Sequence, residues 1–212
     1  MGSELVWYAA YGSNMHASRL DCYLRGGRPP GGLRTYPGCR DPSPPRATRP
    51  MVLPGRMYFA FESKNWTGGL ALYDPLDPGR TPARAYLLTR AQFADLAAQE
   101  MYRAPGVDPD LSTLATIGRA TLGPGRYETV VRVGSSDGHP ILALTAPWRS
   151  ADAPWNAPAA AYLRHLRAGL AEAHGWSGRR AARYLANCPG AAGTWTAEAI
   201  AALPALPGPP TA

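Results

Sequence analysis

The chain has 212 residues, which is enough for one domain with a proper core and too few to require two. Its formal net charge is +7, but the 21 arginines and the single lysine, Lys64, are scattered rather than gathered in a basic helix or block, so nucleic-acid binding is not expected. No apolar run is long enough to span a bilayer, and the start Met1-Gly2-Ser3-Glu4 lacks the basic and apolar regions of a signal peptide, so we expect a soluble protein without membrane contact.

The cysteines and histidines do not follow the spacing of a metal site. Cys22, Cys39 and Cys188 are an odd number without a C-x-x-C pair, which indicates neither a disulfide framework nor a zinc site and favours a reduced, cytoplasmic setting. The four histidines lack a spacing such as H-E-x-x-H, and no phosphate-binding or dinucleotide-binding fingerprint is present. We therefore expect no metal and no organic cofactor.

The N-terminal stretch has the features of a strand that turns directly into a helix. Residues 5–11 are bulky and aromatic, as in a buried strand, and Gly12 permits a sharp turn that a side chain would obstruct. Ser13 or Asn14 is then expected to cap a helix with apolar residues at helical spacing, namely Met15, Leu20, Tyr23 and Leu24. Such a turn leaves backbone N–H groups free at the positive end of the helix dipole, so it can hold a carboxylate or a developing oxyanion. Many such turns bind no ligand, and the pattern alone leaves both interpretations open.

A long loop and a series of short strands follow. Residues 25–50 are dense in Gly, Pro and Arg without apolar periodicity, which predicts a loop. Further strands are predicted at 51–61, 70–73, 83–88, 115–122, 127–133 and 140–145. The strand at 83–88 is expected in the same sheet as those at 51–61 and 70–73. Thr89 and Gln92 have the spacing of a capping box at the start of a helix that ends near Glu100. Residues 136–138 supply a hairpin turn.

The C-terminal third is predicted to be helical. Residues 158–174 carry apolar side chains at helical spacing, and Gly175-Trp176-Ser177 forms a turn into a second helix around Leu185. These two helices form a helical hairpin. A short helix is expected at 197–203, within an otherwise loose, Pro-rich end of the chain.

Together these elements predict an α+β fold. We expect a small, mixed, mostly antiparallel, barrel-like sheet of six to seven strands, with flanking helices and the C-terminal helical hairpin. Gly and Pro number 23 each, which indicates long connecting loops. The expected organisation is a single domain over residues 1–188 and a Pro/Ala-rich tail over residues 189–212.

Glu100 is a candidate proton-transfer residue. It ends a helix in the apolar setting of residues 96–99 and is followed by Met101 and Tyr102. Burial there and the negative end of the helix dipole would both raise the pKa of the carboxyl group toward values useful in proton transfer. An ordinary exposed glutamate at a helix end is the alternative. No catalytic triad is indicated, since Ser13 lacks the G-x-S-x-G elbow.

Six segments follow one another in a recognisable order. The first, Tyr11-Gly12-Ser13-Asn14-Met15, contains the tetrapeptide YGSN. The second is a Leu-Pro-Gly strand ending in Phe (53–61), and the third is the start of a strand at a Gly-Gly pair (66–71). The fourth is a strand and helix ending in glutamate (86–100), the fifth is a strand beginning with Tyr (127–131), and the sixth is a Pro-x-x-Tyr helix with one extra residue (158–162). In this order they resemble the motifs of the γ-glutamylcyclotransferase family and cover most of residues 6–186.

Several regions depart from the family pattern. The loop at 25–50, the stretch 102–125 and the end after Cys188 have no counterpart in it. Leu96-Ala97 stands where Leu-Asp is usual, and Glu100-Met101-Tyr102 replaces Glu-Gly. The resemblance therefore retains the glutamate but leaves its surroundings and the substrate open.

The resemblance implies cleavage of a γ-glutamyl amide by internal attack. The glutamyl α-amine adds to its own side-chain carbonyl and releases 5-oxoproline and an amine, with Glu100 moving the proton. The substrate-binding residues that the resemblance implies are Tyr11, Gly12, Ser13, Asn14, Met15, Gly68, Gly69 and Tyr127. The partner would be a small γ-glutamyl amine or amino acid, and neither a metal nor an organic cofactor is required.

Two other functions stay open at the level of sequence. The same pocket can activate water, which would make the protein a hydrolytic deacylase of an acylated amine. Alternatively, the pocket recognises an anion or a protein without turnover. The oligomeric state, monomer or homodimer, is open as well.

Overall fold

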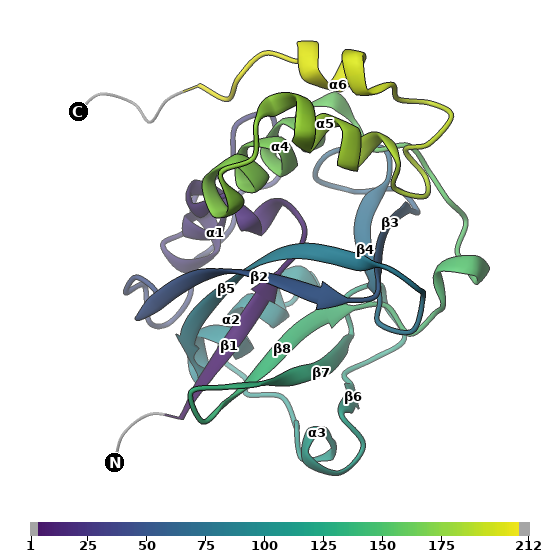
Figure 1. Cartoon of the computed structure of the whole chain (residues 1–212). Coiled ribbons are helices and arrows are strands. Elements are labelled where there is room, and N and C mark those ends of the chain that lie inside the picture. Colours follow the sequence, from purple (N-terminus) through teal and green to yellow (C-terminus); the bar gives the residue numbers. More distant parts are fainter. Residues whose placement is uncertain (1–3, 208–212) are drawn as a thin grey trace.

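Residues 4–207 are described by a computed structural model, and they form eight strands and six α-helices (Figure 1). The strands are β1 (Leu5–Ala10), β2 (Ala47–Pro54), β3 (Arg56–Ala60), β4 (Leu70–Asp74), β5 (Arg80–Thr89), β6 (Arg119–Thr121), β7 (Thr129–Ser136) and β8 (His139–Thr145). The helices are α1 (Ala17–Leu24), α2 (Arg90–Glu100), α3 (Thr113–Thr116), α4 (Ala160–His174), α5 (Gly178–Ala186) and α6 (Ala197–Ala202). The start Met1-Gly2-Ser3 and residues 208–212 of the expected tail lie outside the described residues.

The strands form two sheets. Six of them follow the order β2-β5-β1-β8-β7-β6, and β3 pairs with β4 in a separate two-stranded sheet. β1 is parallel to β8 and antiparallel to β5, and the remaining neighbours pair antiparallel. The predicted α+β class with a mixed, mostly antiparallel sheet of six to seven strands is thereby confirmed, since the main sheet has six strands, and β3 and β4 add a second, small sheet. The division into one domain and a tail stays a prediction.

β1 lies inside the six-stranded sheet, and both of its faces are buried. Trp7 and Ala9 belong to a core shared with α4 and α5, whereas Val6 and Tyr8 belong to a core shared with α1 and α2. Alternate residues of a strand point to opposite faces, so one short strand serves two cores. This explains why its sequence is a continuous apolar run rather than an alternating one.

The helices pack on both sides of this sheet. In Figure 1, α4, α5 and α6 stack together above the sheet and α2 lies behind it. The predicted capping box forms at the start of α2, where Thr89 and Gln92 each accept a hydrogen bond from the other's backbone N–H, at 3.1 and 3.0 Å. The predicted helical hairpin, α4 and α5, is also confirmed. Within residues 4–207, no helix combines the length and apolarity needed to cross a membrane.

The first helix begins later than predicted. Ser13–Met15 form a short 3-10 turn, and α1 starts at Ala17 with His16 as its N-cap. Neither Ser13 nor Asn14 caps this helix, because the Asn14 side chain is directed away from the helix backbone and toward other side chains. The sharp turn after β1 therefore directs Asn14 toward the side chains of Tyr8 and Glu100 instead of capping the helix.

Three further boundaries differ from the prediction. β2 already begins at Ala47, inside the expected loop, because it pairs with β5 along its whole length. β5 consequently belongs to the six-stranded sheet and not to the sheet of β3 and β4. Of the strand expected at 115–122, the structure forms the short β6. It is preceded by α3, and Gly118 between the two adopts a left-handed conformation (φ +69°).

The chain beyond Pro189 packs against the rest of the protein. Ile200 is completely buried, and Arg167 Nη1 donates hydrogen bonds to the carbonyls of Ile200 and Ala201 at 2.7 and 2.8 Å. The Phe59 N–H also donates to the carbonyl of Pro189, at 2.8 Å. The expected loose end is therefore wrong as far as residue 207, because long-range contacts hold a segment whose own sequence looks unstructured.

Substituting Gly69 tests how closely the segment before α4 packs on β4. A Cβ atom at Gly69 would lie 2.0 Å from the Asn156 carbonyl oxygen, so the backbone would have to move. We expect Gly69→Ala to lower the free energy of unfolding by about 1–3 kcal/mol, as overpacking usually does. Gly178→Ala in the first turn of α5, where the added atom meets nothing within 4 Å, should be neutral or gain about 0.5–1 kcal/mol. Denaturant unfolding measures both, and equal effects would contradict this account of Gly69.

Candidate active site

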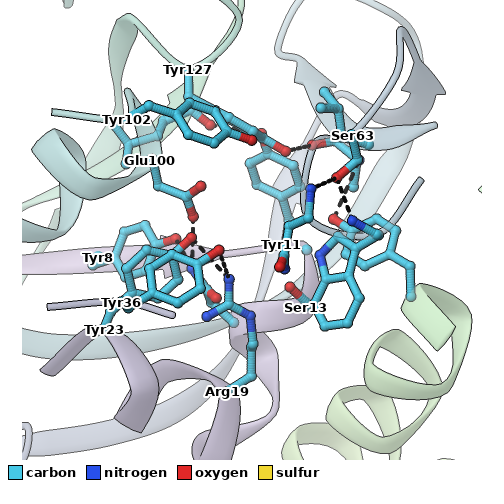
Figure 2. A pocket seen from close by; sticks show the side chains of 18 residues that line it. Tyr8, Tyr11, Ser13, Arg19, Tyr23, Tyr36, Ser63, Glu100, Tyr102 and Tyr127 are labelled. Carbon is cyan, nitrogen blue, oxygen red and sulfur yellow. Dashed lines mark hydrogen bonds between the residues drawn. The ribbon is translucent and has the colours of Figure 1, made fainter. Parts of the chain in front are cut away.

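The C-terminal end of β1 opens into a cavity lined by residues from distant parts of the chain. The Tyr-Gly-Ser-Asn turn, α1, the end of α2 and the loop before β4 all contribute to it. In Figure 2, Glu100 points toward the group formed by Tyr8, Tyr23 and Tyr36, with Arg19 beside these rings. Its lining residues are Tyr8, Tyr11, Gly12, Ser13, Asn14, Arg19, Tyr23, Tyr36, Ser63, Asn65, Trp66, Leu70, Ala71, Glu100, Tyr102, Tyr127, Leu144 and Tyr162.

Glu100 meets the Tyr-Gly-Ser-Asn turn in this cavity. Its Oε1 accepts a hydrogen bond from Asn14 Nδ2 at 3.0 Å, although the two residues are 86 positions apart. The same amide group donates to the Tyr8 hydroxyl at 3.1 Å, and the Asn14 carbonyl accepts from the Tyr86 hydroxyl at 2.9 Å. Asn14 is thus fixed at its side chain and its backbone, and it orients the carboxylate.

The pKa of Glu100 is raised above its ordinary value. Burial is the largest cause, because it disfavours the charged carboxylate. The positive charge of Arg19 and the hydrogen bond from Asn14 act in the opposite direction without cancelling the effect of burial. The direction predicted from the sequence is confirmed, and it suits a group that takes up and returns a proton.

Arg19 is a buried cation that sequence reasoning missed. Its side chain is only 2% exposed, and Nη2 donates to the hydroxyls of Tyr23 and Tyr36 at 3.0 and 2.7 Å. Burial disfavours its charge, but Tyr23, Tyr36 and Glu100 outweigh burial and hold the pKa of Arg19 above its usual value. Its Nε and Nη1 have no hydrogen-bond partner among residues 4–207. A bound anion would satisfy these donors, whose burial without a partner is unfavourable.

A signal for Arg19 does exist in the sequence. Arg19 and Tyr23 are four residues apart on α1, so they lie on the same face of the helix as the core residues Leu20 and Leu24. An arginine on the apolar face of a helix needs partners, because a buried charge is otherwise very unfavourable. Only the tertiary structure supplies Tyr36, which comes from the long loop and stacks on the guanidinium at 4.4 Å.

Gly12 permits close packing rather than an unusual backbone conformation. Its φ is −93°, which any residue can adopt, but a Cβ atom there would lie 3.2 Å from the Tyr162 hydroxyl oxygen. Met15 and His16 donate their N–H groups to the carbonyls of Gly12 and Ser13. The N–H groups that precede them in the 3-10 turn have no partner within it, as at the start of any helix.

The structure brings most, but not all, of the predicted site residues to the cavity. Tyr11, Gly12, Ser13, Asn14, Glu100 and Tyr127 line it. Met15 does not line it, because its side chain is buried against Gly169 of α4. Gly68 and Gly69 do not line it either, since the backbone carbonyls of residues 156 and 157 fill the space that their side chains would need.

Tyr102 forms another wall of the cavity, at the end of α2, in an unusual backbone conformation. Its φ is +61°, and the Arg103 N–H donates to the Ala98 carbonyl at 2.8 Å, which is the hydrogen bond of a Schellman helix end. Glycine is usual at such a position, because a left-handed conformation costs other residues about 1–2 kcal/mol. The Tyr102 ring lies under the guanidinium of Arg34 at 4.4 Å and the ammonium of Lys64 at 5.4 Å. The strained backbone therefore occurs at a residue whose side chain lines the cavity.

No metal site accompanies the cavity in the described part of the chain. Nowhere in residues 4–207 do three or more His, Cys, Asp or Glu side chains gather in an arrangement that would hold a metal ion. The polar groups of the cavity are instead a carboxylate, a guanidinium, amides and hydroxyls. Such a set is suited to proton transfer and to binding an anion.

Known proteins resemble this chain both by sequence and by structure. No protein-family model matches the chain. The chain is 33% identical over 198 residues to a protein named Histone deacetylase 5 from Arabidopsis thaliana, a match that covers 85% of this chain and 30% of that protein's length. Among solved structures, a γ-glutamyl cyclotransferase is similar with a TM-score of 0.52 and 14% identity. An uncharacterized protein from Homo sapiens is similar with a TM-score of 0.52 and 16% identity. Both structural matches cover 93% of this chain and 96% of the other.

These comparisons establish the fold. The chain has the fold of γ-glutamyl cyclotransferase, and the resemblance stated from the sequence is confirmed at that level. At 14–16% identity this similarity shows the fold and not the activity. The plant relative is matched over less than a third of its length, so its name describes that protein as a whole.

The strained backbone at Tyr102 predicts that glycine, which usually makes a protein less stable than alanine does, is the more stabilising of the two at this position. Tyr102→Ala and Tyr102→Gly both remove the ring, but only glycine adopts the left-handed conformation freely. We expect the glycine variant to be more stable than the alanine variant by about 1 kcal/mol after allowing for the greater flexibility of glycine when unfolded. Thermal or denaturant unfolding of the pair measures this difference. A more stable alanine variant would show that the backbone at this position is not strained.

Proposed function

We propose that the protein is an enzyme that cleaves a γ-glutamyl amide and releases 5-oxoproline and an amine. The observation that supports this most is the placement of Glu100, hydrogen-bonded at 3.0 Å to Asn14 of the Tyr-Gly-Ser-Asn turn inside one cavity. The likeness to a solved γ-glutamyl cyclotransferase, which extends over 93% of the chain, is consistent with it.

In this proposal Glu100 moves one proton in each half of the reaction. Its carboxylate takes a proton from the substrate α-ammonium and passes it to solvent, and the freed amine nitrogen attacks the side-chain carbonyl carbon of the same glutamyl group. The attacking nitrogen then gives its second proton to Glu100, the original carbon–nitrogen bond of the amide breaks, and Glu100 passes this proton to the leaving amine. Because nucleophile and target belong to one molecule, the protein mainly has to hold the substrate in a folded conformation. The raised pKa of Glu100 brings it closer to that of the groups between which it transfers the proton.

The anionic parts of the substrate would meet the donors of Arg19 and of the Tyr-Gly-Ser-Asn turn. The Nε and Nη1 groups of Arg19 lack partners within the described chain, and the N–H groups at the start of the 3-10 turn lie next to the cavity. We assign the substrate α-carboxylate and the developing oxyanion to these donors. Tyr127, whose hydroxyl donates to the Ala71 carbonyl, forms the wall against which the substrate chain rests.

Hydrolysis on the same scaffold is the second candidate. The plant relative carries the name of a deacetylase, although this chain spans only 30% of its length. In that case Glu100 would activate water, and a γ-glutamyl substrate would yield free glutamate in place of 5-oxoproline. The two products differ by one water molecule, so mass spectrometry separates the candidates.

Substitution of Glu100 tests the proposed reaction. Purified protein should release 5-oxoproline from at least one member of a panel of γ-glutamyl amines, amino acids and peptides. Glu100→Gln removes the proton acceptor and should lower kcat by about 10²–10⁴-fold. Glu198→Gln on the exposed face of α6 is the matched control and should leave the rate unchanged. Free glutamate would support hydrolysis, and turnover that survives Glu100→Gln would contradict the role of Glu100.

The pH dependence tests the electrostatic role of Arg19. Glu100 has to be ionised to accept the proton, so kcat/KM should fall as the pH drops through its pKa. The charge of Arg19 lowers that pKa, so Arg19→Gln should raise it and move the acidic limb of the pH profile to higher pH. Arg19→Lys keeps the positive charge, so its acidic limb should lie close to the wild-type position. If the limb stays in place in a folded Arg19→Gln protein, Arg19 does not act on Glu100.

A further inference from the structure

The helix α5 carries three arginines whose charges are not neutralised within the described chain. Arg179 and Arg180 lie in its first turn and Arg183 lies in its last turn, and all three residues are exposed. None of them forms an ion pair with a carboxylate of residues 4–207. The helix therefore presents an unbalanced positive face to solvent.

This arrangement of charge is unfavourable for the helix itself. Arg179 and Arg180 stand at the positive end of the helix dipole, where a cation is disfavoured, and the first turn contains no acidic residue. Arg179 and Arg183 are four residues apart, so two like charges lie next to each other on one side of the helix. Surfaces that lower stability without an internal compensation are typical of functional sites.

A groove of about 260 Å³ continues the positive face at the C-terminal end of α5. It is lined by Arg56 and Arg80, at the starts of β3 and β5, and by Tyr184 and Asn187 at the end of the helix. Residues four apart on a helix are neighbours on one face, so Arg183 lies next to Asn187 and borders the groove. The arginine face of α5 and the groove thus form one continuous surface.

The groove adds further positive charge to this surface. Arg56 is paired with Asp77 at 3.6 Å, whereas Arg80 is exposed and forms no ion pair with a carboxylate of the described chain. Arginines that are scattered along the sequence therefore meet in space. An anionic partner would supply the carboxylates or phosphates that the described chain does not.

Two kinds of anionic partner fit this surface poorly. Binding of single-stranded nucleic acid draws on aromatic rings that are free to stack on bases, but Trp176 is covered by the Arg180 guanidinium at 4.3 Å and meets Tyr184 edge-on. Adsorption of a helix to a membrane draws on an apolar face, but Ala181 and Leu185 of α5 are completely buried in the core. A polypeptide with acidic side chains requires neither feature.

We infer that α5 and the adjoining groove bind an acidic, extended polypeptide segment of a partner protein. Carboxylates pair with arginine through two parallel hydrogen bonds, which gives geometric specificity as well as attraction. The nine residues of α5 extend over about 13 Å, which about four residues of an extended chain would cover. The inference does not depend on the proposed function, because the groove and the candidate active site have no lining residue in common.

A labelled acidic peptide tests the inference. An N-acetylated, fluorescein-labelled octaglutamate peptide should raise its fluorescence anisotropy with the protein, whereas the matching octaglutamine peptide should not. Arg179→Gln combined with Arg183→Gln should raise the Kd for octaglutamate about five- to tenfold, as expected for the loss of two exposed charge pairs. Arg80→Gln should raise the Kd about two- to threefold, and it tests the surface from an element other than α5.

Removal of the same charge elsewhere is the matched control. Arg28→Gln combined with Arg132→Gln also removes two exposed arginines that have no ion pair within residues 4–207, and it should change the Kd by less than about twofold. Thermal unfolding verifies that the variants are folded.

Three results would overturn the inference. The first is an equal rise in Kd for both double variants, since net charge alone would then explain the attraction. The second is the absence of any binding of octaglutamate. The third is tighter binding of labelled octaadenylate RNA or of phosphatidylserine vesicles that is lost in the α5 double variant, because it would assign this surface to a different class of partner.

Discussion

The position of β1 between two neighbours is the constraint on which the candidate site depends. β5 runs antiparallel to β1, so its last residue, Thr89, lies opposite Leu5 at the start of β1. α2 follows β5 directly and runs back along the sheet for 11 residues, or about 16 Å at 1.5 Å per residue. β1 covers about 20 Å over its six residues. The end of α2 is thereby returned to the end of β1, which is why Glu100 meets Asn14.

The site holds charged groups that the interior of a protein disfavours. Burial raises the pKa of Glu100, and the buried Arg19 has donors without partners in the described chain. Each group stabilises the charge of the other, and the tyrosine hydroxyls at Arg19 distribute that charge over several contacts. Together with the left-handed backbone of Tyr102, these features lower stability locally. Such costs are typical of binding and catalytic sites, where function and stability make opposite demands.

The fold and the site carry different kinds of information about function. The fold shared with γ-glutamyl cyclotransferase includes the strand β1 and the helix α2, and in this chain the cavity forms where the ends of these two elements meet. Part of the lining of that cavity comes from connecting segments. Tyr36 lies in the loop at 25–50 and Tyr102 in the stretch 102–125, two of the regions in which this chain departs from the family pattern. A change of substrate within one fold is most readily made there, because loops tolerate substitution without disturbing the sheet.

The sequence by itself determined the features that depend on near neighbours along the chain. The buried strand β1, the Thr89–Gln92 capping box, the turn at 136–138 and the helical hairpin each arise from residues a few positions apart, whose periodicity and turn chemistry are local. The direction of the Glu100 pKa shift was also predicted from its place at the end of an apolar helix. Only the tertiary structure decided the partners of Asn14 and Arg19, the packing of Gly12 against the Tyr162 side chain and of Gly69 against distant backbone, and the order of the chain beyond Pro189. Those features depend on contacts between residues tens of positions apart, which no local pattern encodes.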